Sequence, residues 1–283
     1  MTVDIIIPTY KRGDLLVEAL KSVQQQSYSE WRCWIAEDGH SEATSKAIKH
    51  FLADKRFKYL PGDHAGAPAV PRNRAIKAGK ADYIAILDDD DIWLPEKLQY
   101  QVDFMDKHLE CAMVGANGYI WSGRAIKHGE GLPLYHEKVP EGEVTLKKLL
   151  QDNCFIGSGT LIRRKNLSKS GPFNTELIPP LGEDYELWLR LAATGSLWFL
   201  VKPLLYFRVI PESKYYGKKL TRAECYEWKA KILSHALAGF QGCRPFQDPS
   251  NKHLRKLVTQ KLNRLLAGPG VLGLLKYLTR LIT

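Results

Sequence analysis

The chain has 283 residues, of which 45% are apolar and 25% charged, and its formal net charge is +10. This balance is typical of a folded globular protein and excludes a disordered tail or a low-complexity linker. No run approaches the roughly 18 consecutive apolar residues of a membrane-spanning helix, and the first residues lack the pattern of a secretion signal. The five cysteines are scattered without a C-x-x-C pair. We therefore expect reduced thiols and a cytoplasmic protein.

The positive charge is concentrated at the C-terminal end. No acidic residue follows Asp248, whereas seven basic residues do: Lys252, Arg255, Lys256, Lys261, Arg264, Lys276 and Arg280. A basic surface attracts nucleic acid, anionic membranes or anionic substrates, so its position matters more than its total charge. These bases alternate with leucines rather than with aromatic residues, and we expect no nucleic-acid partner.

The first hundred residues alternate short apolar runs with helical patterns. They predict the following order: strand 3–7, helix 15–23, strand 32–36, helix 42–52, strand 57–60, helix 73–78 and strand 83–87. This alternation is typical of β-α-β units on a mostly parallel, Rossmann-like α/β sheet. Such sheets bind ligands at the carboxyl ends of their strands. Acidic residues follow two of the predicted strands there, at 37–38 and 88–91.

The alternation stops beyond Pro95. We expect a helix to residue 107, a strand at 112–114, an irregular glycine-rich stretch at 115–142, a strand at 160–163, a helix at 184–193 and a strand at 198–209. Three helices should follow, at 222–238, 253–266 and 271–282, with Gly268-Pro269-Gly270 separating the last two. The pattern divides the chain into residues 1–110, residues 111–215 as a second half of the same domain, and a helical tail at 216–283.

Asp88, Asp89, Asp90 and Asp91 form the most informative motif. Adjacent carboxylates repel one another unless a positive group lies among them, and Mg²⁺ is held by one or two carboxylates together with substrate phosphates. A solvated acidic turn is the plain alternative. The run directly follows an apolar strand and precedes the apolar pair at 92–93. This position favours a metal site at the end of the strand.

Five motifs, in order, resemble those of the family 2 glycosyltransferases. They are Ile5-Ile6-Ile7-Pro8-Thr9-Tyr10-Lys11-Arg12, Glu37-Asp38-Gly39, Pro71-Arg72-Asn73, the strand 83–87 with its four aspartates, and Gly182-Glu183-Asp184. The resemblance covers about residues 1–210. It implies a GT-A fold, with a mixed sheet flanked by helices, that binds a nucleotide sugar through residues 1–110 and an acceptor through residues 111–215. It also implies an inverting, metal-dependent hexosyltransferase that uses Mn²⁺ or Mg²⁺.

The resemblance further implies which residues bind the donor. The set comprises Pro8, Thr9, Tyr10, Arg12, Asp38, Arg72, Asp88 and Asp89. Within it, Thr9 and Tyr10 would line the base pocket, Asp38 would accept from the base or ribose, and Arg72 would face the nucleotide or its phosphates. Three plain alternatives stay open: Asp38 as a turn residue, Arg72 as a surface charge and Tyr10 as a packing aromatic.

The metal and the catalytic base come from the same resemblance. Asp88 and Asp90 are the outer members of the D-x-D motif, with Asp90 the first choice as metal ligand. Glu183 and Asp184, at the start of a helix, would be the catalytic pair, and Asp184 would remove the proton of the acceptor hydroxyl in a single in-line displacement. N-terminal capping is the alternative for both acids of this pair.

One position departs from the family pattern. Many members carry a histidine shortly after a Tyr-Arg pair near the end of the catalytic core, whereas Ile210 stands at that point here. We therefore expect a thinner metal shell, completed by diphosphate and water or by Glu212.

The helices at 253–266 and 271–282 predict contact with the inner face of the cell membrane, because each sets leucines on one face and bases on the other. Packing of these leucines on the protein's own core or at a dimer interface is the alternative. We expect a UDP-sugar donor and a saccharide or lipid-linked acceptor in cell-surface polysaccharide synthesis, with Tyr119, Trp121, Tyr135 and His136 shaping the acceptor pocket. A catalytically inactive sugar-nucleotide-binding module and a nucleotidyltransferase remain alternative functions.

Overall fold

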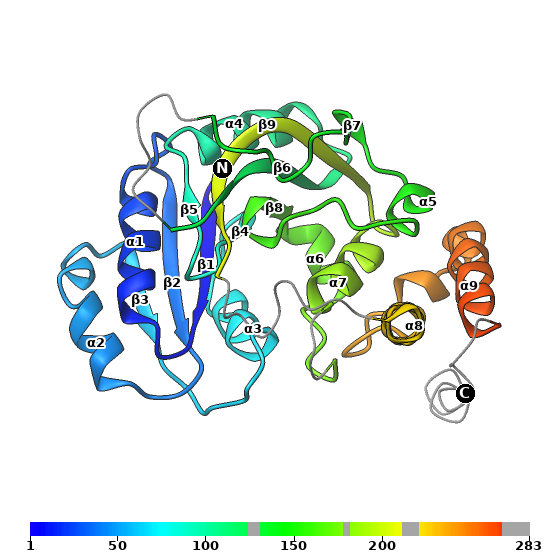
Figure 1. Ribbon diagram of the computed structural model, residues 1–283, viewed down its shortest axis with the longest axis horizontal. Helices are drawn as coiled ribbons and strands as arrows, with labels where there is room; N and C mark the ends of the chain where they lie inside the picture. The colour runs from blue at the N-terminus through cyan, green and yellow to red at the C-terminus, as the bar shows by residue number, and fades with distance from the viewer. Residues whose placement is uncertain (124–130, 178–181, 211–220, 268–283) are drawn as a thin grey trace.

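The computed structural model describes residues 1–123, 131–177, 182–210 and 221–267. The strands are β1 (Val3–Thr9), β2 (Trp31–Glu37), β3 (Phe57–Leu60), β4 (Tyr83–Ile86), β5 (Ile92–Trp93), β6 (Cys111–Trp121), β7 (Gly142–Glu143), β8 (Thr160–Arg163) and β9 (Ser196–Arg208). The helices are α1 (Gly13–Gln24), α2 (Glu42–Ile48), α3 (Ala69–Ala78), α4 (Lys97–Lys107), α5 (Leu146–Leu149), α6 (Arg164–Ser170), α7 (Glu183–Leu191), α8 (Arg222–Ala238) and α9 (Lys252–Leu266). Helices cover the sheet, and α8 and α9 lie together at one side of the molecule (Figure 1).

One mixed sheet joins the two halves of the chain. Its strand order is β3-β2-β1-β4-β8-β6-β9-β5, and β7 pairs with β9. The strands β3, β2, β1 and β4 are parallel, and β8 then adds antiparallel to β4. The parallel part confirms the β-α-β alternation expected for the first hundred residues, and it brings the carboxyl ends of β1 and β4 side by side.

Alternating side chains of the central strands fill two separate cores. Ile5 and Ile7 of β1 belong to a core that also contains residues of α1 and α4, whereas Ile6 points into a second core with residues of α7, α8 and α9. Both layers are apolar because a sheet covered by helices on both faces exposes neither face to water. The ends of the strands, rather than their faces, are therefore left for ligands.

The glycine-rich stretch expected to be irregular begins inside a strand, and this prediction is wrong for residues 115–121. β6 continues through Gly115 and Gly118 to Trp121 and pairs along its length with β9. A Cβ atom at residue 115 would lie 2.4 Å from the ring of Phe155, and one at residue 118 would lie 3.0 Å from Leu205. These glycines permit close packing within a sheet and do not mark a loop.

Smaller differences concern element ends. The helix expected at 42–52 stops at Ile48 and a 3₁₀ turn follows at Phe51–Ala53, whereas the helix expected from residue 73 begins earlier, at Ala69. The helix α6 and the short elements β5, β7 and α5 were not anticipated. The helix predicted at 271–282 lies outside the described residues.

The apolar stripe of α9 packs on the protein itself. Val258, Leu262 and Leu265 are buried in the core shared with α8, and Leu254 and Leu257 pack against it. The leucines of α9 therefore pack on the protein's own core, which was the alternative to their contact with a membrane. None of the helices in the described ranges has both the length and the apolar character needed to cross a bilayer.

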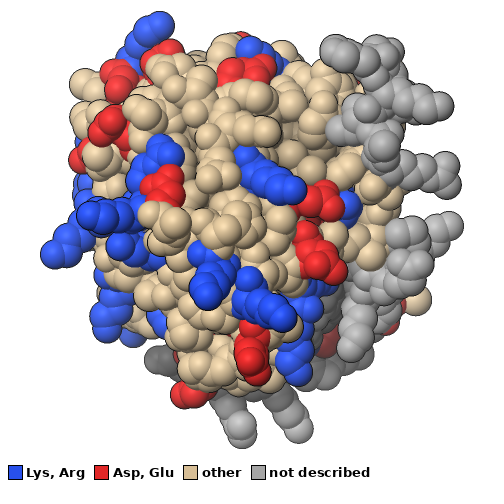
Figure 2. Space-filling model, turned by 90° about the vertical axis from the view of Figure 1, so that its left-hand side faces the viewer, with Lys and Arg blue, Asp and Glu red and all other residues tan. Residues whose placement is uncertain are grey.

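Basic residues of α9 remain exposed on its other face, among them Lys252, Arg255, Lys256 and Arg264. On the side of the molecule where α1 and α2 lie, basic and acidic side chains are interspersed (Figure 2). The excess positive charge is thus not gathered on that face.

Candidate functional site

The carboxyl ends of β1 and β4 bring Thr9 and Arg12 to the aspartate run. Thr9 Oγ1 donates to Asp89 Oδ2 at 2.7 Å. Arg12 Nη1 donates to Asp90 Oδ2 at 2.9 Å and to Asp89 Oδ1 at 3.3 Å. Lys11, between them in sequence, has φ +53°, which a residue with a side chain rarely adopts. The backbone here is bent so that the loop after β1 lies over the acids.

Two residues not anticipated from the sequence fix the backbone of the aspartate run. The backbone N–H of Asp88 donates to Ser158 Oγ at 3.0 Å. Arg208 at the end of β9 donates from its backbone N–H to Asp91 Oδ1 at 2.8 Å and from Nε to the carbonyl of Asp90 at 2.7 Å. Arg208 lies two residues before Ile210, in the segment Tyr206-Phe207-Arg208, whereas no sequence signal marks Ser158.

Arg72 joins the aspartate run to the acids of α7. It projects from α3 and donates from Nη2 to Asp88 Oδ1 at 2.6 Å and from Nη1 to Glu183 Oε1 at 2.7 Å. The residue is 5% exposed, which excludes the surface-charge alternative. Its guanidinium also lies 5.2 Å from the ring centre of Phe173. Arg72 therefore bridges the two acidic motifs that the sequence singled out.

The two acids at the start of α7 have different surroundings. Glu183 is buried and held by Arg72, and its Oε2 accepts from the backbone N–H of Gly182 at 3.1 Å. Asp184 is half-buried, and its Oδ1 accepts from the backbone N–H of Tyr185 at 2.6 Å. Gly182 has φ +137°, and a Cβ there would lie 2.5 Å from Ile232. This glycine lets the chain enter α7 tightly against α8.

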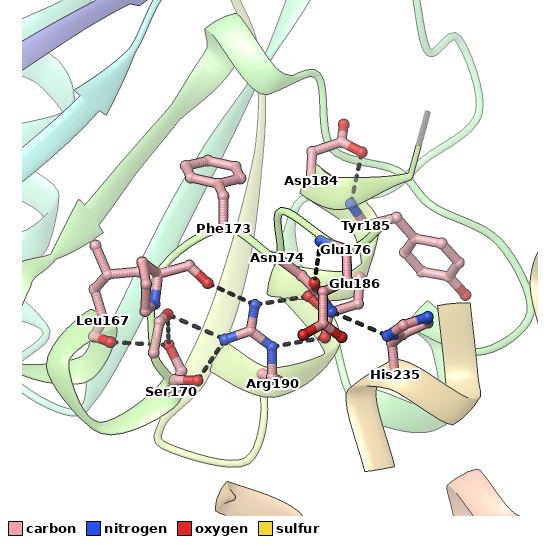
Figure 3. A network of polar contacts seen from close by, with 12 residues as sticks. Leu167, Ser170, Phe173, Asn174, Glu176, Asp184, Tyr185, Glu186, Arg190 and His235 are labelled. Carbon is pink, nitrogen blue, oxygen red and sulfur yellow. Dashed lines mark hydrogen bonds and ion pairs between the residues drawn. The ribbon is translucent and has the colours of Figure 1, made fainter. Parts of the chain in front are cut away.

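A buried ion pair fixes the other end of α7 (Figure 3). Arg190 donates to both carboxylate oxygens of Glu186, at 2.8 and 2.6 Å, and both side chains are fully buried. Arg190 also donates to the carbonyls of Ser170, Gly171 and Pro172 at the end of α6. The five N–H groups of an arginine suit such a bridge. The orientation of α7, and of Asp184 on it, depends on this contact.

The loop after α6 is tied to α3 and α8 as well. Asn73 Nδ2 donates to the carbonyl of Phe173 at 2.7 Å, and the N–H of Phe173 donates back to Asn73 Oδ1 at 2.9 Å. Asn174 Nδ2 lies 3.2 Å from His235 Nδ1 on α8. The neighbour of Arg72 in sequence thus holds the aromatic ring against which Arg72 packs.

Burial and mutual repulsion raise the pKa values of the clustered acids. Burial, with the charge of Asp90, raises the pKa of Asp89 to about 7. Burial, with the charge of Glu183, raises the pKa of Asp184 to about 7. Burial and the charge of Asp88 also raise the pKa of Asp90. A cation bound beside these acids would favour their ionised forms and lower these pKa values.

The aspartate run suits a divalent cation that also binds a diphosphate. The side chains of Asp88 and Asp90 remain 35% and 23% exposed, whereas that of Asp89 is 8% exposed and bonded to Thr9. Within the described ranges, no three His, Cys, Asp or Glu side chains gather closely enough to cage a metal alone. Mg²⁺ needs only one or two carboxylates when phosphates and water supply the remaining ligands. The donor set therefore fits Mn²⁺ or Mg²⁺ on Asp88 and Asp90.

The residues expected around the base lie beside a second loop. Asp38 Oδ1 accepts from the N–H of Ala65 at 2.6 Å, and its Oδ2 accepts from that of Gly66 at 2.9 Å. Tyr10 is 41% exposed and stacks on the ring of His64. Pro8 is buried within β1. Asp38 therefore holds the turn 64–66, and Tyr10 presents its ring beside it.

The remaining expected positions lie around β6 and β9. Tyr119 stacks on Tyr206 with ring centres 5.7 Å apart, and the guanidinium of Arg208 lies 4.1 Å from the ring centre of Trp121. Ile210, where the family pattern has a histidine, is half-buried. Glu212 lies outside the described residues.

Comparison with known proteins places the chain in a family. Residues 4–171 match the family model "Glycosyl transferase family 2". The chain is 32% identical over 195 residues to the Escherichia coli UDP-Glc:alpha-D-GlcNAc-diphosphoundecaprenol beta-1,3-glucosyltransferase WfgD, covering 69% of this chain and 71% of WfgD. It is 30% identical over 201 residues to a putative colanic acid biosynthesis glycosyl transferase, WcaA, of E. coli K12, covering 69% and 68% of the two chains.

Solved structures share the fold at low sequence identity. S. aureus TarS 1–349 in complex with UDP-GlcNAc has a TM-score of 0.70 at 17% identity, covering 100% of this chain and 82% of that one. The mannosyltransferase PcManGT from Pyrobaculum calidifontis, in complex with GDP-Man and Mn²⁺, has a TM-score of 0.59 at 16% identity, covering 99% and 79%. This chain spans only 44% of a longer TarS chain. The mixed sheet, its flanking helices and the matched family model together show that the chain belongs to glycosyl transferase family 2 and has the GT-A fold.

Proposed function

We propose that the protein transfers a sugar, with inversion, from a nucleoside-diphosphate sugar to a saccharide or lipid-linked saccharide acceptor. The observation that carries this proposal is the Arg72 bridge. It connects Asp88, in the motif suited to a metal and a diphosphate, with Glu183, the neighbour of the candidate base Asp184. The bridge supports one site in which donor and acceptor meet.

The donor would bind along the carboxyl ends of β1, β2 and β4. Tyr10 offers an exposed ring for the base, and Asp88 and Asp90 would hold a divalent cation. When bound, such a cation supplies positive charge to the departing nucleoside diphosphate. Among the residues of the chain, Arg12 contributes a cation beside Asp90, 2.9 Å away. UDP-sugars are the proposed donors because the TarS structure holds UDP-GlcNAc and WfgD is named as a UDP-Glc-dependent glucosyltransferase.

The transfer step uses Asp184 as general base. The carboxylate takes the proton of the acceptor hydroxyl while the acceptor oxygen bonds to the anomeric carbon. The bond from that carbon to the diphosphate breaks, and its electron pair leaves with the nucleoside diphosphate. A base works best when its pKa lies near the working pH, and the raised pKa of Asp184, about 7, meets this condition.

Cell-surface polysaccharide synthesis at the inner face of the cell membrane is the proposed setting. WfgD acts, by its name, on a diphosphoundecaprenol-linked sugar, and WcaA is named for colanic acid biosynthesis. The exposed bases of α9 suit an anionic lipid surface, because each basic residue near such a surface contributes about 1 kcal/mol of binding. The leucines of α9 pack on α8, so charge rather than apolar insertion would make this contact.

Release of nucleoside diphosphate tests the proposal. Purified protein is incubated with a panel of UDP- and GDP-sugars and a membrane lipid extract as acceptor, with Mn²⁺, with Mg²⁺ or with EDTA. We expect acceptor-dependent release from one donor with either cation, a loss of at least about 100-fold in Asp184→Asn, and little release in EDTA. Release from no donor, with nucleotide still bound, would instead favour a sugar-nucleotide-binding module.

A further inference from the structure

Two aromatic rings lie face to face at the edge of the proposed donor site. The rings of Tyr10 and His64 have centres 4.4 Å apart and planes inclined by 14°. Tyr10 follows β1, and His64 lies in the loop between β3 and α3. Both rings reach the surface, since Tyr10 is 41% exposed and the His64 side chain 51% exposed. Stacking of two rings leaves one face of Tyr10 covered.

The imidazole also reaches the acid beneath the stack. His64 Nδ1 lies 3.0 Å from Asp38 Oδ2, and the Asp38 side chain is 7% exposed. A flat heterocycle that stacks on Tyr10 and directs a ring nitrogen to Asp38 makes the contacts expected of a nucleotide base. His64 therefore supplies, from within the chain, a substitute for the base.

The backbone N–H groups of Ala65 and Gly66 bond to the Asp38 side chain and not to the imidazole, whose Nδ1 also lies 3.3 Å from the carbonyl of Asp38. Asp38 holds the turn through the N–H groups of Ala65 and Gly66, at 2.6 and 2.9 Å. Gly66 has φ +73°, a conformation that glycine adopts without strain. An exposed side chain on a turn held by other contacts can rotate away while the turn stays in place. Loss of the ring should therefore leave the loop and Asp38 where they are.

We infer that His64 occupies the place of the donor base and that nucleotide binding displaces it from Tyr10 and Asp38. The inference rests on the proposed function, because it takes Tyr10 and Asp38 as the base contacts. Displacement subtracts the free energy of the His64 contacts from that of nucleotide binding. His64 thus weakens donor affinity without contacting the reacting atoms.

Nucleotide affinity of a His64→Ala variant tests the inference. The probes are UDP, GDP, ADP and CDP, titrated by calorimetry into the full chain. The ring stack and the contact between the imidazole and Asp38 together suggest a Kd lower by about tenfold for the nucleotide that binds the wild type. His50→Ala is the matched control, because His50 is an exposed histidine against another ring, Phe51 at 4.0 Å, away from Asp38. Its Kd should equal that of the wild type.

A spectroscopic measurement follows the imidazole directly. The His64 Cε1–H signal, identified by its loss in His64→Ala, should carry a ring-current shift from Tyr10 in the free protein and lose it when nucleotide saturates the site. An unchanged or higher Kd in His64→Ala, or a His64 signal that keeps its shift in the complex, would overturn the inference while leaving the proposed function intact. Absence of binding by any nucleotide to either protein would overturn both.

Discussion

Adjacent acids take different roles because their neighbours differ. Glu183 is buried, and its carboxylate accepts hydrogen bonds from Arg72 and from the backbone N–H of Gly182. Asp184 is half-buried and accepts one backbone hydrogen bond, from Tyr185. Burial and the charge of Glu183 disfavour the ionised form of Asp184 and so raise its pKa. These contacts make Glu183 a structural carboxylate and leave Asp184 as the proposed proton acceptor.

The pKa of Asp184 predicts how activity varies with pH. Because this pKa is about 7, kcat/KM should fall about tenfold for each pH unit below 7, as the base becomes protonated in the free enzyme. The measurement is kcat/KM for the acceptor from pH 5 to 9. Asp89 has a similarly raised pKa, so Asp89→Asn serves as control and should keep the acidic limb. If kcat/KM of Asp89→Asn no longer fell below pH 7, the group whose protonation abolishes activity would be Asp89 and not Asp184.

The same pKa also predicts a change in stability. The folded-state pKa lies above the ordinary value of 3.8, so the stability that this group contributes below pH 3.8 is lost as pH rises through about 7. Asp184→Asn removes the costly charge. Its melting temperature should therefore exceed that of the wild type at pH 8 by more than at pH 5, although activity is lost. An equal difference in melting temperature between Asp184→Asn and the wild type at pH 5 and pH 8 would contradict the raised pKa of Asp184.

Individual site residues were predictable to the extent that they belong to short motifs. Asp88, Asp90 and Asp184 follow from acids at strand and helix ends, and the structure joins them through Arg72. Ser158 and Arg208 could not be predicted as partners of the aspartate run, because they lie 70 and 117 residues away from Asp88 and Asp91 in sequence. Contacts across such distances depend on the order of the strands, which no local spacing encodes.

At the scale of elements, the position of Asp184, the proposed base, depends on how α7 is held. Periodic leucines predicted this helix, yet they do not indicate what fixes its C-terminal half. That role belongs to the buried Glu186 and Arg190 pair and to the carbonyls at the end of α6 that Arg190 caps (Figure 3). Glu186 and Arg190 are both fully buried on this helix, and no apolar pattern indicates a buried charged pair.

Removal of one member of this pair should cost more than removal of both. Arg190→Met leaves the Glu186 charge buried without its partner, which costs about 3–5 kcal/mol. Adding Glu186→Leu removes that charge, so the double variant should be more stable than Arg190→Met. Free energies of unfolding from urea titrations, followed by circular dichroism, measure the difference. A double variant less stable than Arg190→Met would contradict this account of α7.

At the scale of the whole molecule, the sheet lies between α1 and α2 on one side and α8 and α9 on the other (Figure 1). The division at residues 110 and 215 stays a prediction, since β6, β8 and β9 of the second half complete the sheet of the first. The tail's charge was predictable from composition alone. The direction of its leucine face was not, because an apolar stripe has the same sequence pattern whether it meets lipid or α8.

The exposed bases of α9 predict salt-sensitive binding to anionic vesicles. Substitution of Lys252, Arg255 and Lys256 by Glu should weaken binding to phosphatidylglycerol-containing liposomes by at least about 100-fold. Each basic residue contributes about 1 kcal/mol of binding, and the three contributions together correspond to this factor. The matched control reverses three exposed lysines near α2, Lys46, Lys49 and Lys55, with the same change in charge. Cosedimentation at low and high salt measures both variants. Equal losses in the two would show that only net charge matters.

Stereochemistry of transfer tests the central claim most directly. Time-resolved ¹H NMR of the reaction, with the donor identified from the panel and a water-soluble acceptor analogue, reads the coupling constant of the anomeric proton in the first product formed. A single displacement assisted by Asp184 predicts an anomeric configuration opposite to that of the donor, with no such product from Asp184→Asn. A product that retains the donor configuration would contradict the proposed mechanism and require a covalent intermediate or a front-face displacement.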